Sequence, residues 1–400
     1  MERRPGRPEL SVVIPTHGRP RFLGACLDAL AAQDTPPGAF EVIVSIDGPD
    51  AATDRLLGQG RWPFSPIVVR GDRGGAGAAR NRGAAMAQGR ILLFLDDDMV
   101  AAPGLVGAHL RAHASDEGRP ALVIGWIDLL AGGGEAREPL AAAYRRAWQR
   151  HHERLAAAAR PLDPTDAYGG NLSVPCQAFR DVGGFTTDLS SVEDVELATR
   201  LATAGAAILF AANAIARHDD PKNSARFLAD AEREGAAGLE LWRRHPTLLA
   251  HLELGRWVER RPAARGALRL ALATGLSPAA AARLTTAARP LFVGRRGSAW
   301  ADRLFAYLRT VAAWRGLRNA PGGRAAFRAL TRGLPVLMYH GLAAPGEVPS
   351  RYVLGEAELA AQLRWLRRGG WRSATLSEVA DGLAAGRPVP ERTVVLTFDD

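Results

Sequence analysis

The stretch that decides the fold reads ILLFLDDD and runs from Ile91 to Asp98. Its five consecutive apolar residues predict a strand that is buried in a sheet. The three carboxylates that follow repel one another, so they are stable there only if a cation or a polar ligand occupies the site. In extended backbone the side chains of Asp96 and Asp98 point the same way. Their oxygens suit a hard divalent ion such as Mg²⁺ or Mn²⁺, and an acidic turn that closes a strand is the alternative interpretation.

Segments typical of strands and helices alternate around this stretch, up to about residue 215. The alternation predicts a mostly parallel sheet with helices on both faces. Ligands bind such sheets at the carboxyl ends of the strands, which places Pro15, Thr16, Asp47 and the three acids around one crevice. We expect strands at 10–15, 41–46, 67–69, 91–95 and 207–210, and helices at 21–33, 76–87 and 195–204.

Composition sets the broad class of the protein. The chain has 400 residues, 47% hydrophobic and 23% charged, which allows two or three domains with sizeable cores and excludes broad disorder. Cys26 and Cys176 are its only cysteines, so it carries no disulfide framework and fits a reducing compartment. The apolar run at 10–15 is too short for a secretory leader, and no stretch is long enough to span a membrane. We therefore expect a cytoplasmic protein.

The net charge of +9 is unevenly distributed. Residues 255–334 contain 16 arginines against Glu259 and Asp302, a net charge of +14, which leaves −5 for the rest of the chain. The region from 222 to 333 is predicted to be helical, with breaks at 275–278, Pro290 and 321–323. The basic segment could lie on anionic lipid at the inner face of the cell membrane. A helical linker with a solvated face is the favoured alternative, because Arg315 and Arg318 fall close to the apolar stripe.

A series of short motifs makes residues 10–220 resemble the family 2 glycosyltransferases of the GT-A fold. Each motif is modest by itself, but their order and spacing together are specific. The series comprises Ser11–Arg19 (SVVIPTHGR), Glu41–Gly48, Gly77–Gly83, Leu95–Asp98, Gly169–Leu172, Gly183–Phe185 and Glu193–Leu197.

This resemblance implies a nucleotide-sugar donor, namely a UDP-, GDP- or dTDP-sugar. Many relatives carry two acids after the second strand, whereas here Ile46 precedes Asp47, so the identity of the base stays open. Gly75–Arg80 ends in arginine where a dinucleotide-binding loop has glycine, so we interpret it as a loop near the diphosphate. Arg80 should then pair bidentately with an oxyanion or with Asp96, and a surface arginine is the alternative. The implied donor-binding residues are Pro15, Thr16, Arg19, Asp47, Arg80, Asp96 and Asp97.

The resemblance also implies catalytic, metal and acceptor residues. Transfer with inversion needs a carboxylate that takes the proton of the acceptor hydroxyl, and this role falls to Asp194, with Glu193 as the second candidate. Acids that merely stabilise a helix N-terminus are the alternative interpretation. The implied ligands of Mg²⁺ or Mn²⁺ are Asp96, Asp98 and His218, and Gly170 and Asn171 are implied to face the acceptor.

A third region begins near Leu334 and resembles the opening of the polysaccharide deacetylase family. The matching motifs are Val336–His340 and Val394–Asp400, with expected strands at 335–339 and 393–398 and a helix at 356–368. The resemblance implies that His340, Asp399 and Asp400 belong to a metal-dependent hydrolase site. The later histidine pair of that family is absent from this sequence, and the region is shorter than a (β/α)-barrel requires. We therefore predict no deacetylase activity from it.

Taken together, these patterns predict an α/β chain with three parts: a GT-A, Rossmann-like sheet domain (1–235), an Arg-rich helical linker (236–333) and an incomplete (β/α)-barrel fragment (334–400). The predicted function is that of a metal-dependent inverting glycosyltransferase of polysaccharide biosynthesis. It moves a sugar from a nucleotide-sugar donor to a glycan or lipid-linked acceptor, in a bifunctional chain with a truncated deacetylase module. The alternatives are a deacetylase whose N-terminal domain only binds nucleotide sugar, and a non-catalytic binding module. No nucleic-acid partner is expected.

Overall fold

The computed structural model describes most of the chain. The described residues are 7–36, 38–60, 62–114, 118–129, 138–158, 160–219, 223–257, 259–275, 277–292, 294–332, 334–343, 353–384 and 389–398. Asp399 and Asp400, two of the residues implied by the deacetylase resemblance, lie outside them. No described helix is both long and apolar enough to cross a lipid bilayer.

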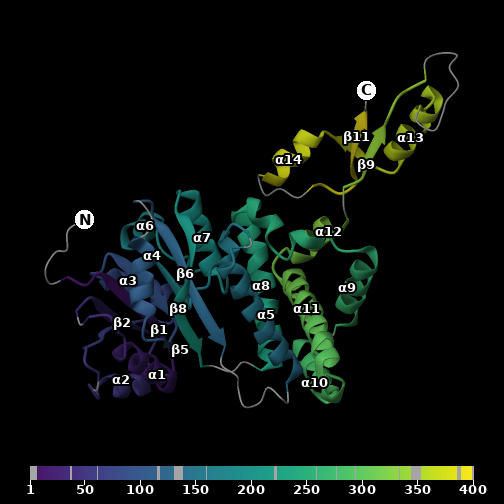
Figure 1. Ribbon diagram of the computed structural model, residues 1–400. Coiled ribbons are helices and arrows are strands. Elements are labelled where there is room, and N and C mark those ends of the chain that lie inside the picture. The colour runs from purple at the N-terminus through teal and green to yellow at the C-terminus, as the bar shows by residue number, and fades with distance from the viewer. Residues whose placement is uncertain are drawn as a thin grey trace. The chain divides into compact units, whose positions relative to one another are not determined.

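The strands and helices follow the expected order along the chain (Figure 1). The strands are β1 (Leu10–Thr16), β2 (Phe40–Asp47), β3 (Ile67–Gly71), β4 (Ile91–Leu95), β5 (Met99–Ala101), β6 (Ala121–Leu129), β7 (Asn171–Pro175), β8 (Ala207–His218), β9 (Val336–Tyr339), β10 (Arg372–Ala374) and β11 (Thr393–Phe398). The helices are α1 (Pro20–Ala31), α2 (Ala51–Leu57), α3 (Gly75–Met86), α4 (Leu105–Ala114), α5 (Pro139–Ala156), α6 (Cys176–Asp181), α7 (Glu193–Thr203), α8 (Ser224–Arg244), α9 (Pro262–Thr274), α10 (Pro278–Ala287), α11 (Gly294–Asn319), α12 (Gly323–Arg332), α13 (Glu356–Arg368) and α14 (Leu376–Ala384).

The chain divides into two compact units, Met1–Arg233 with Leu276–Arg309, and Glu234–Gly275 with Thr310–Asp400. The first unit is built on an eight-stranded sheet in the order β3-β2-β1-β4-β7-β6-β8-β5, within the described residues. β1 pairs in parallel with β2 and β4, and β6 pairs in parallel with β8. β7 runs antiparallel to β4 and β6, and β5 runs antiparallel to β8. The mostly parallel sheet predicted from the alternation is therefore confirmed, with an antiparallel strand inserted at its centre.

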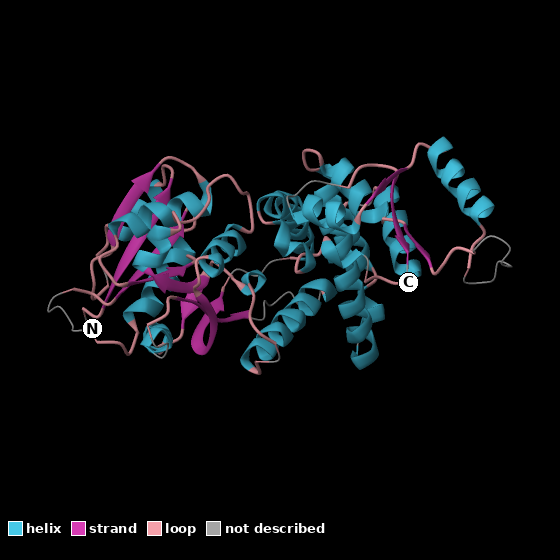
Figure 2. Cartoon of the chain, turned by 90° about the horizontal axis from the view of Figure 1, so that it is seen from above, coloured by secondary structure: helices cyan, strands magenta, loops and turns pink. Residues whose placement is uncertain are grey.

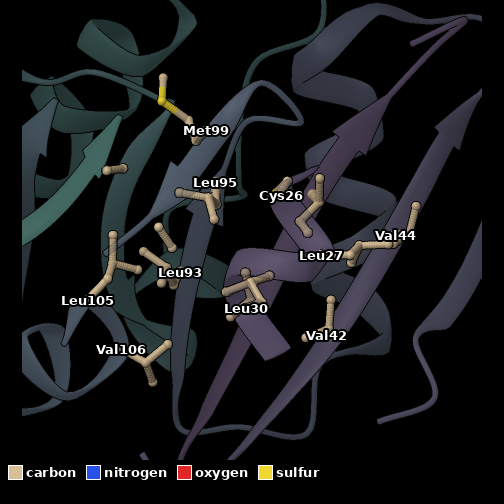
Figure 3. Close-up of a cluster of buried hydrophobic side chains, with 14 of the residues drawn as sticks. Cys26, Leu27, Leu30, Val42, Val44, Leu93, Leu95, Met99, Leu105 and Val106 are labelled. Atoms are coloured by element: carbon tan, nitrogen blue, oxygen red, sulfur yellow. The ribbon is translucent and has the colours of Figure 1, made fainter. Parts of the chain in front are cut away.

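Helices cover both faces of this sheet, as Figures 1 and 2 show. The strand residues alternate between two hydrophobic clusters, because successive side chains of a strand point to opposite faces. Leu93 and Leu95 of β4 pack with Leu27 and Leu30 of α1 on one face (Figure 3). Leu92 and Phe94 pack on the other face, where α3, α6 and α7 contribute their buried side chains. β4 is consequently buried along its whole length, as its apolar sequence predicts.

Two elements differ from the expected ones in ways that affect the site. β8 runs to His218, well beyond the predicted end at residue 210, because it continues past a bulge in its pairing with β6 and then pairs with β5. The α7 helix begins at Glu193 and not at Val195, so both acids of the Glu193-Asp194 pair lie in its first turn. Both differences bring expected site residues onto regular secondary structure.

The second unit contains helices and a small sheet. Trp257, Trp314 and Leu317 belong to a hydrophobic cluster that α8, α9, α11 and α12 share, so the expected linker helices form a core of their own. A three-stranded parallel sheet of order β10-β11-β9 follows. Both faces of a parallel sheet are normally covered, yet Val336 and Met338 of β9 are more than half exposed, at 51% and 59%. The domain boundaries at 235 and 333, and the barrel fragment, stay predictions.

Candidate functional site

The polar residues at the end of β4 face a turn that leads into β7. Leu95 pairs with Asn171, and the backbone N–H of Asp96 donates to the carbonyl of Gly170 over 3.3 Å. The Gly169-Gly170 turn therefore lies beside the three acids, although some 70 residues separate the two in sequence. The parallel and antiparallel pairing of β4 fixes this position.

A buried arginine joins the elements of the site. The Arg80 side chain, only 5% exposed, donates to Asp96 Oδ1 over 2.7 Å and to Glu193 Oε1 over 2.8 Å. The surrounding acids raise its pKa, although burial by itself would lower it. Arg80 therefore pairs with Asp96, but through one hydrogen bond and not bidentately as expected, and the surface-arginine alternative is wrong. Glu193 was not expected in this pair, because only the folding of α7 onto α3 brings it there.

The two glycines before β7 leave room for this ion pair. A Cβ atom on Gly169 would lie 3.0 Å from Arg80 Cζ, and one on Gly170 would lie 3.0 Å from Asp96 Oδ2 and 2.8 Å from the end of Met99. Contacts as short as these require a neighbour to shift, and Arg80 is held on both sides. The Gly-Gly motif is thus explained by close approach of the backbone to charged side chains.

Asp194 is held by backbone N–H groups at the start of α7. Gly169 N–H donates to its Oδ2 over 2.9 Å and Val195 N–H donates to its Oδ1 over 2.8 Å. Burial and the neighbouring Glu193 raise its pKa to about 7, against the lowering effect of Gly169 and Arg80. Val192, directly before the helix, has the left-handed backbone angle φ +61°, which is strained for a β-branched residue. Strain of this kind is retained where the structure fixes a functional turn.

Asp98 and His218 meet because β5 starts directly after the acids and pairs with the end of β8. His218 Nε2 lies 3.3 Å from Asp98 Oδ2, and both side chains are largely buried. Burial alone would raise the pKa of Asp98, but His218 and Arg19 hold it well below its usual value. Arg19 donates to the same Oδ2 over 2.7 Å and lies 3.1 Å from Asp97. Asp98 Oδ1 is buried without a hydrogen-bond partner.

These features bear on the expected metal site. An unpartnered, buried carboxylate oxygen next to a histidine nitrogen is a donor set that suits Mg²⁺ or Mn²⁺, so Asp98 and His218 fit such an ion. Asp96, the third expected ligand, accepts from Arg80 through Oδ1, and its part in metal binding stays a prediction. Within the described residues, no group of three or more His, Cys, Asp or Glu side chains is arranged to hold a metal. The protein residues described would thus supply part of a coordination shell, and the oxygens of a diphosphate and water would supply the remainder.

The expected donor-binding residues at the ends of β1 and β2 are held by internal contacts. Thr16 donates to Asp97 Oδ2 over 2.7 Å, and burial raises the pKa of Asp97 to about 7 despite Arg19 and Thr16. Asp47 accepts from the N–H groups of Gly74 and Gly75, each over 2.9 Å, and from Arg82 over 2.8 Å. Burial would raise the pKa of Asp47, but Arg82 and the two N–H groups hold it below its usual value. Asp47 therefore anchors the loop that leads into α3, next to Pro15 and Thr16.

Asn171 does not face an acceptor, which corrects the sequence-based expectation. Its side chain is fully buried, and its Nδ2 donates to the carbonyls of Trp126 and Ala214. Its Oδ1 lies 2.9 Å from His109 Nε2, which must therefore donate to it. Asn171 holds β7 to β6 and β8, and only the backbone of Gly170 remains a candidate for the acceptor side.

Sequence reasoning missed His109 and the hydroxyl next to it. His109 Nδ1 lies 2.8 Å from Ser173 Oγ, which also lies 2.8 Å from His113 Nε2. Burial lowers the pKa of His109 to about 4. His152 is likewise fully buried, and burial lowers its pKa to about 4. His109 and His113 lie four residues apart on α4, but this spacing alone gives no sequence signal for a contact with Ser173.

The Gly183-Gly184-Phe185 motif proves to be structural. Asn81 of α3 exchanges two hydrogen bonds with the backbone of Phe185, over 2.8 and 2.9 Å. Arg80 Cζ lies 5.3 Å above the Phe185 ring. The motif therefore fixes the loop before α7 against α3, next to the ion pair that α3 carries.

Part of the first unit matches a known protein family. The family model described as "Glycosyl transferase family 2" matches residues 11–183. The solved structure of a mannosyltransferase, PcManGT from Pyrobaculum calidifontis in complex with GDP-Man and Mn²⁺, superimposes with a TM-score of 0.55 at 21% identity. That superposition covers 77% of this chain and 87% of the other, and it shows a shared GT-A-like fold.

Curated relatives match this chain either over a shorter stretch or at a lower sequence identity. The validoxylamine A glucosyltransferase of Streptomyces hygroscopicus subsp. limoneus is 41% identical over 109 residues, 27% of this chain. The match spans only about a quarter (24%) of that relative's own length. The glycosyltransferase AglE of Haloferax volcanii is 26% identical over 59% of this chain and 74% of its own length. The pre-mycofactocin glycosyltransferase of Mycobacterium tuberculosis is 28% identical over 62% of this chain and 50% of its own length.

Replacing Arg80 by alanine should destabilise the first unit by about 3 kcal/mol, because it leaves Asp96, Glu193 and Asp194 without their shared cation. Chemical denaturation measures this loss. Arg70→Ala is the matched control, since its ion pair with Asp54 is exposed and should contribute about 1 kcal/mol or less. Equal effects of the two substitutions would contradict the central place given to Arg80.

The buried neutral histidines should contribute a loss of stability as the pH is lowered. Below the unfolded-state pKa of about 6.5 the unfolded chain binds protons, whereas His109 and His152 in the folded chain stay unprotonated until the pH nears 4. Each should therefore remove about 1.4 kcal/mol of unfolding free energy per pH unit across this window, while Asp97 and Asp194, whose pKa values are raised to about 7, act in the opposite direction. Denaturation at pH 7, 6 and 5 measures the slope, and His109→Gln should shift it by about 1.4 kcal/mol per pH unit toward greater stability at low pH. An unchanged slope in that variant would show that His109 is not buried in its neutral form.

Proposed function

We propose that this chain, whose residues 11–183 form a domain of glycosyl transferase family 2, transfers a sugar from a nucleotide-sugar donor to an acceptor hydroxyl with inversion at the anomeric carbon. The observation that carries the proposal is the position of Asp194. Its carboxylate lies at the start of α7, is held to the Gly169-Gly170 turn, and neighbours the Arg80 ion pair at the end of β4. Asp194, the Arg80 ion pair and the buried glycine turn thus lie together at one edge of the sheet, which supports a base beside the donor there.

Asp194 would act as the general base. The acceptor oxygen attacks the anomeric carbon as its proton passes to Asp194, and the bond to the diphosphate breaks with both electrons leaving on the phosphate oxygen. A base is most effective when its pKa lies near the working pH, and burial next to Glu193 raises the pKa of Asp194 to about 7. The two backbone N–H groups fix the direction of its oxygens. Glu193 is the less suitable base because its carboxylate is paired with the Arg80 guanidinium, whereas Asp194 accepts only from neutral backbone N–H groups.

The donor would bind at the ends of β1, β2 and β4. Arg19 is 30% exposed and lies on Asp97 and Asp98, so it can reach a diphosphate beside them. Asp98 and His218 would hold a divalent cation, which neutralises charge on the departing nucleoside diphosphate when it is bound. A fold neighbour solved with GDP-Man and Mn²⁺ and glucosyltransferase relatives support a hexose nucleotide with Mg²⁺ or Mn²⁺. A glycan or a lipid-linked sugar would be the acceptor.

We also propose that residues 334–400 are related to the start of a polysaccharide deacetylase. β9 and β11 are neighbours, and Tyr339 pairs with Phe398, which are the residues directly before His340 and Asp399. This register supports kinship with the start of a polysaccharide deacetylase, and hence a bifunctional origin. The exposed apolar residues of β9 agree with a sheet that is incomplete by itself. Residues 334–400 should not hydrolyse acetamides.

Asp194→Asn should retain donor binding and lose turnover by about a hundred-fold or more, the usual contribution of a general base. The rate of the unmodified protein should fall about tenfold per pH unit below pH 7, since the base must be deprotonated. Release of nucleoside diphosphate measures both. If Glu193→Gln loses turnover and Asp194→Asn turns over at nearly the unmodified rate, the base has been assigned to the wrong carboxylate.

Asp98→Asn should abolish the Mn²⁺-dependent part of nucleoside diphosphate binding, because it removes the charge and the unpartnered oxygen that suit the cation. Isothermal titration calorimetry with and without Mn²⁺ measures this part. Asp128→Asn, at an exposed position on β6, serves as the control and should bind normally. Undiminished metal-dependent affinity in Asp98→Asn would rule out the assignment.

Deleting residues 334–400 should leave sugar transfer within about twofold of the full chain, because this region has its own sheet and the proposed site draws all its residues from the first unit. Transfer assays on both chains test this. Acetate release from an N-acetylglucosamine oligomer by the full chain, lost in Asp399→Asn, would show that the region is a working deacetylase instead.

A further inference from the structure

Three large apolar side chains are exposed within one short segment of the first unit. They are Leu284 of α10 at 62%, Leu291 of the short helix η5 (Arg289–Phe292) at 74%, and Trp300 of α11 at 63%. A soluble protein commonly exposes single apolar residues, but several in one segment mark an interaction surface. The segment includes α10 and the first half of α11, which Figure 1 labels.

Exposed arginines alternate with these apolar residues along the sequence. Arg283, Arg289, Arg296 and Arg303 are all exposed, and Asp302 is the single acidic residue in the sequence from 277 to 309. Asp302 is engaged by Arg146 over 2.6 Å and by Arg150 over 3.1 Å, both on α5. Its charge is therefore compensated from within the unit. The outward-facing charge of the segment is positive.

The spacing along α11 places aromatic and basic side chains together. Arg296, Trp300 and Arg303 follow one another at intervals of four and three residues, so they lie on one side of the helix. Arg303 Cζ is 5.7 Å from the centre of the Trp300 ring. The opposite side of the helix carries Phe305, which is buried and packs against Tyr144 of α5. The helix thus has a covered apolar side, and Trp300 is not needed for packing.

We propose that this surface, formed by Arg283, Leu284, Arg289, Leu291, Arg296, Trp300 and Arg303 and here called the Arg–Trp surface, binds the anionic headgroups of a lipid bilayer. Tryptophan and leucine enter the boundary between headgroups and acyl chains, and arginines pair with lipid phosphates. A nucleic acid would satisfy the arginines but would leave the two leucines in water. The lipid bilayer accounts for both kinds of side chain.

The reason for favouring a helical linker with a solvated face does not apply to this surface. Arg315 and Arg318, whose position near the apolar stripe favoured that interpretation, lie in the second half of α11 beyond this surface and are only partly exposed. The Arg–Trp surface is fixed to the unit that holds the proposed site through the Asp302 ion pairs with α5. Binding would therefore keep the enzyme at the bilayer, where a lipid-linked acceptor resides. That consequence rests on the proposed function, whereas binding itself does not.

Co-sedimentation of the full chain with vesicles tests the proposal. Phosphatidylcholine vesicles containing phosphatidylglycerol should bind the protein, and pure phosphatidylcholine vesicles should bind it at least tenfold more weakly. Trp300→Ala should weaken binding about tenfold through lost apolar burial, and Arg296→Gln with Arg303→Gln should weaken it further, by about fivefold for each charge. Trp365→Ala is the matched control, since this residue on α13 is 68% exposed and should bind within twofold of the unmodified chain.

Two outcomes would overturn the proposal. One is the absence of binding to the anionic vesicles at low salt. The other is binding that Trp300→Ala leaves unchanged and that a soluble polyanion such as single-stranded DNA displaces fully, which would indicate a site for a charged polymer. Neither outcome depends on sugar transfer, so an inactive enzyme that binds vesicles would leave the proposal standing while refuting the proposed function.

Discussion

The arrangement of the site depends on one buried guanidinium. Arg80 lies on α3, pairs with Asp96 at the end of β4 and with Glu193 at the start of α7, and is covered by the Gly169-Gly170 turn. Removing charged groups from water is costly, so an arrangement of this kind is stable only when every charge has a partner. Strand β4, helices α3 and α7 and the turn before β7 must therefore adopt one mutual position. That position brings Asp194 to the edge of the sheet where donor and acceptor would meet.

Much of this fold is predictable from local sequence patterns. The apolar run of β4 and its acidic end predict a buried strand with a polar ligand, and the pairing of Arg80 with Asp96 follows from an acid at a strand end that faces an arginine of the next helix. The length of β8 is not predictable in this way, because its last residues are held by β5 and not by their own hydrophobicity. The contact between His218 and Asp98 consequently arises only in the tertiary structure, and the family resemblance was the only part of the sequence analysis that predicted it.

The role of Asn171 illustrates what sequence patterns cannot supply. An asparagine after two glycines beside an acidic motif is compatible with substrate binding and with sheet packing. The structure shows sheet packing, because His109, Trp126 and Ala214, which are far away in sequence, form hydrogen bonds with both the oxygen and the nitrogen of its side chain. Asp47 is similar, since the loop at Gly74 and Gly75 engages both of its oxygens. Polar residues near a site need their tertiary partners before a role can be assigned.

The most direct test of the account is the stereochemistry of the transferred sugar. The full chain should be incubated with Mn²⁺, a panel of UDP-, GDP- and dTDP-hexoses and a glycan or lipid-linked acceptor, and the product should be analysed by NMR. A base at Asp194 that deprotonates the attacking hydroxyl predicts consumption of one donor class and a product whose anomeric configuration is opposite to that of the donor. A product that retains the donor's configuration, or donors that bind without being consumed, would contradict the account.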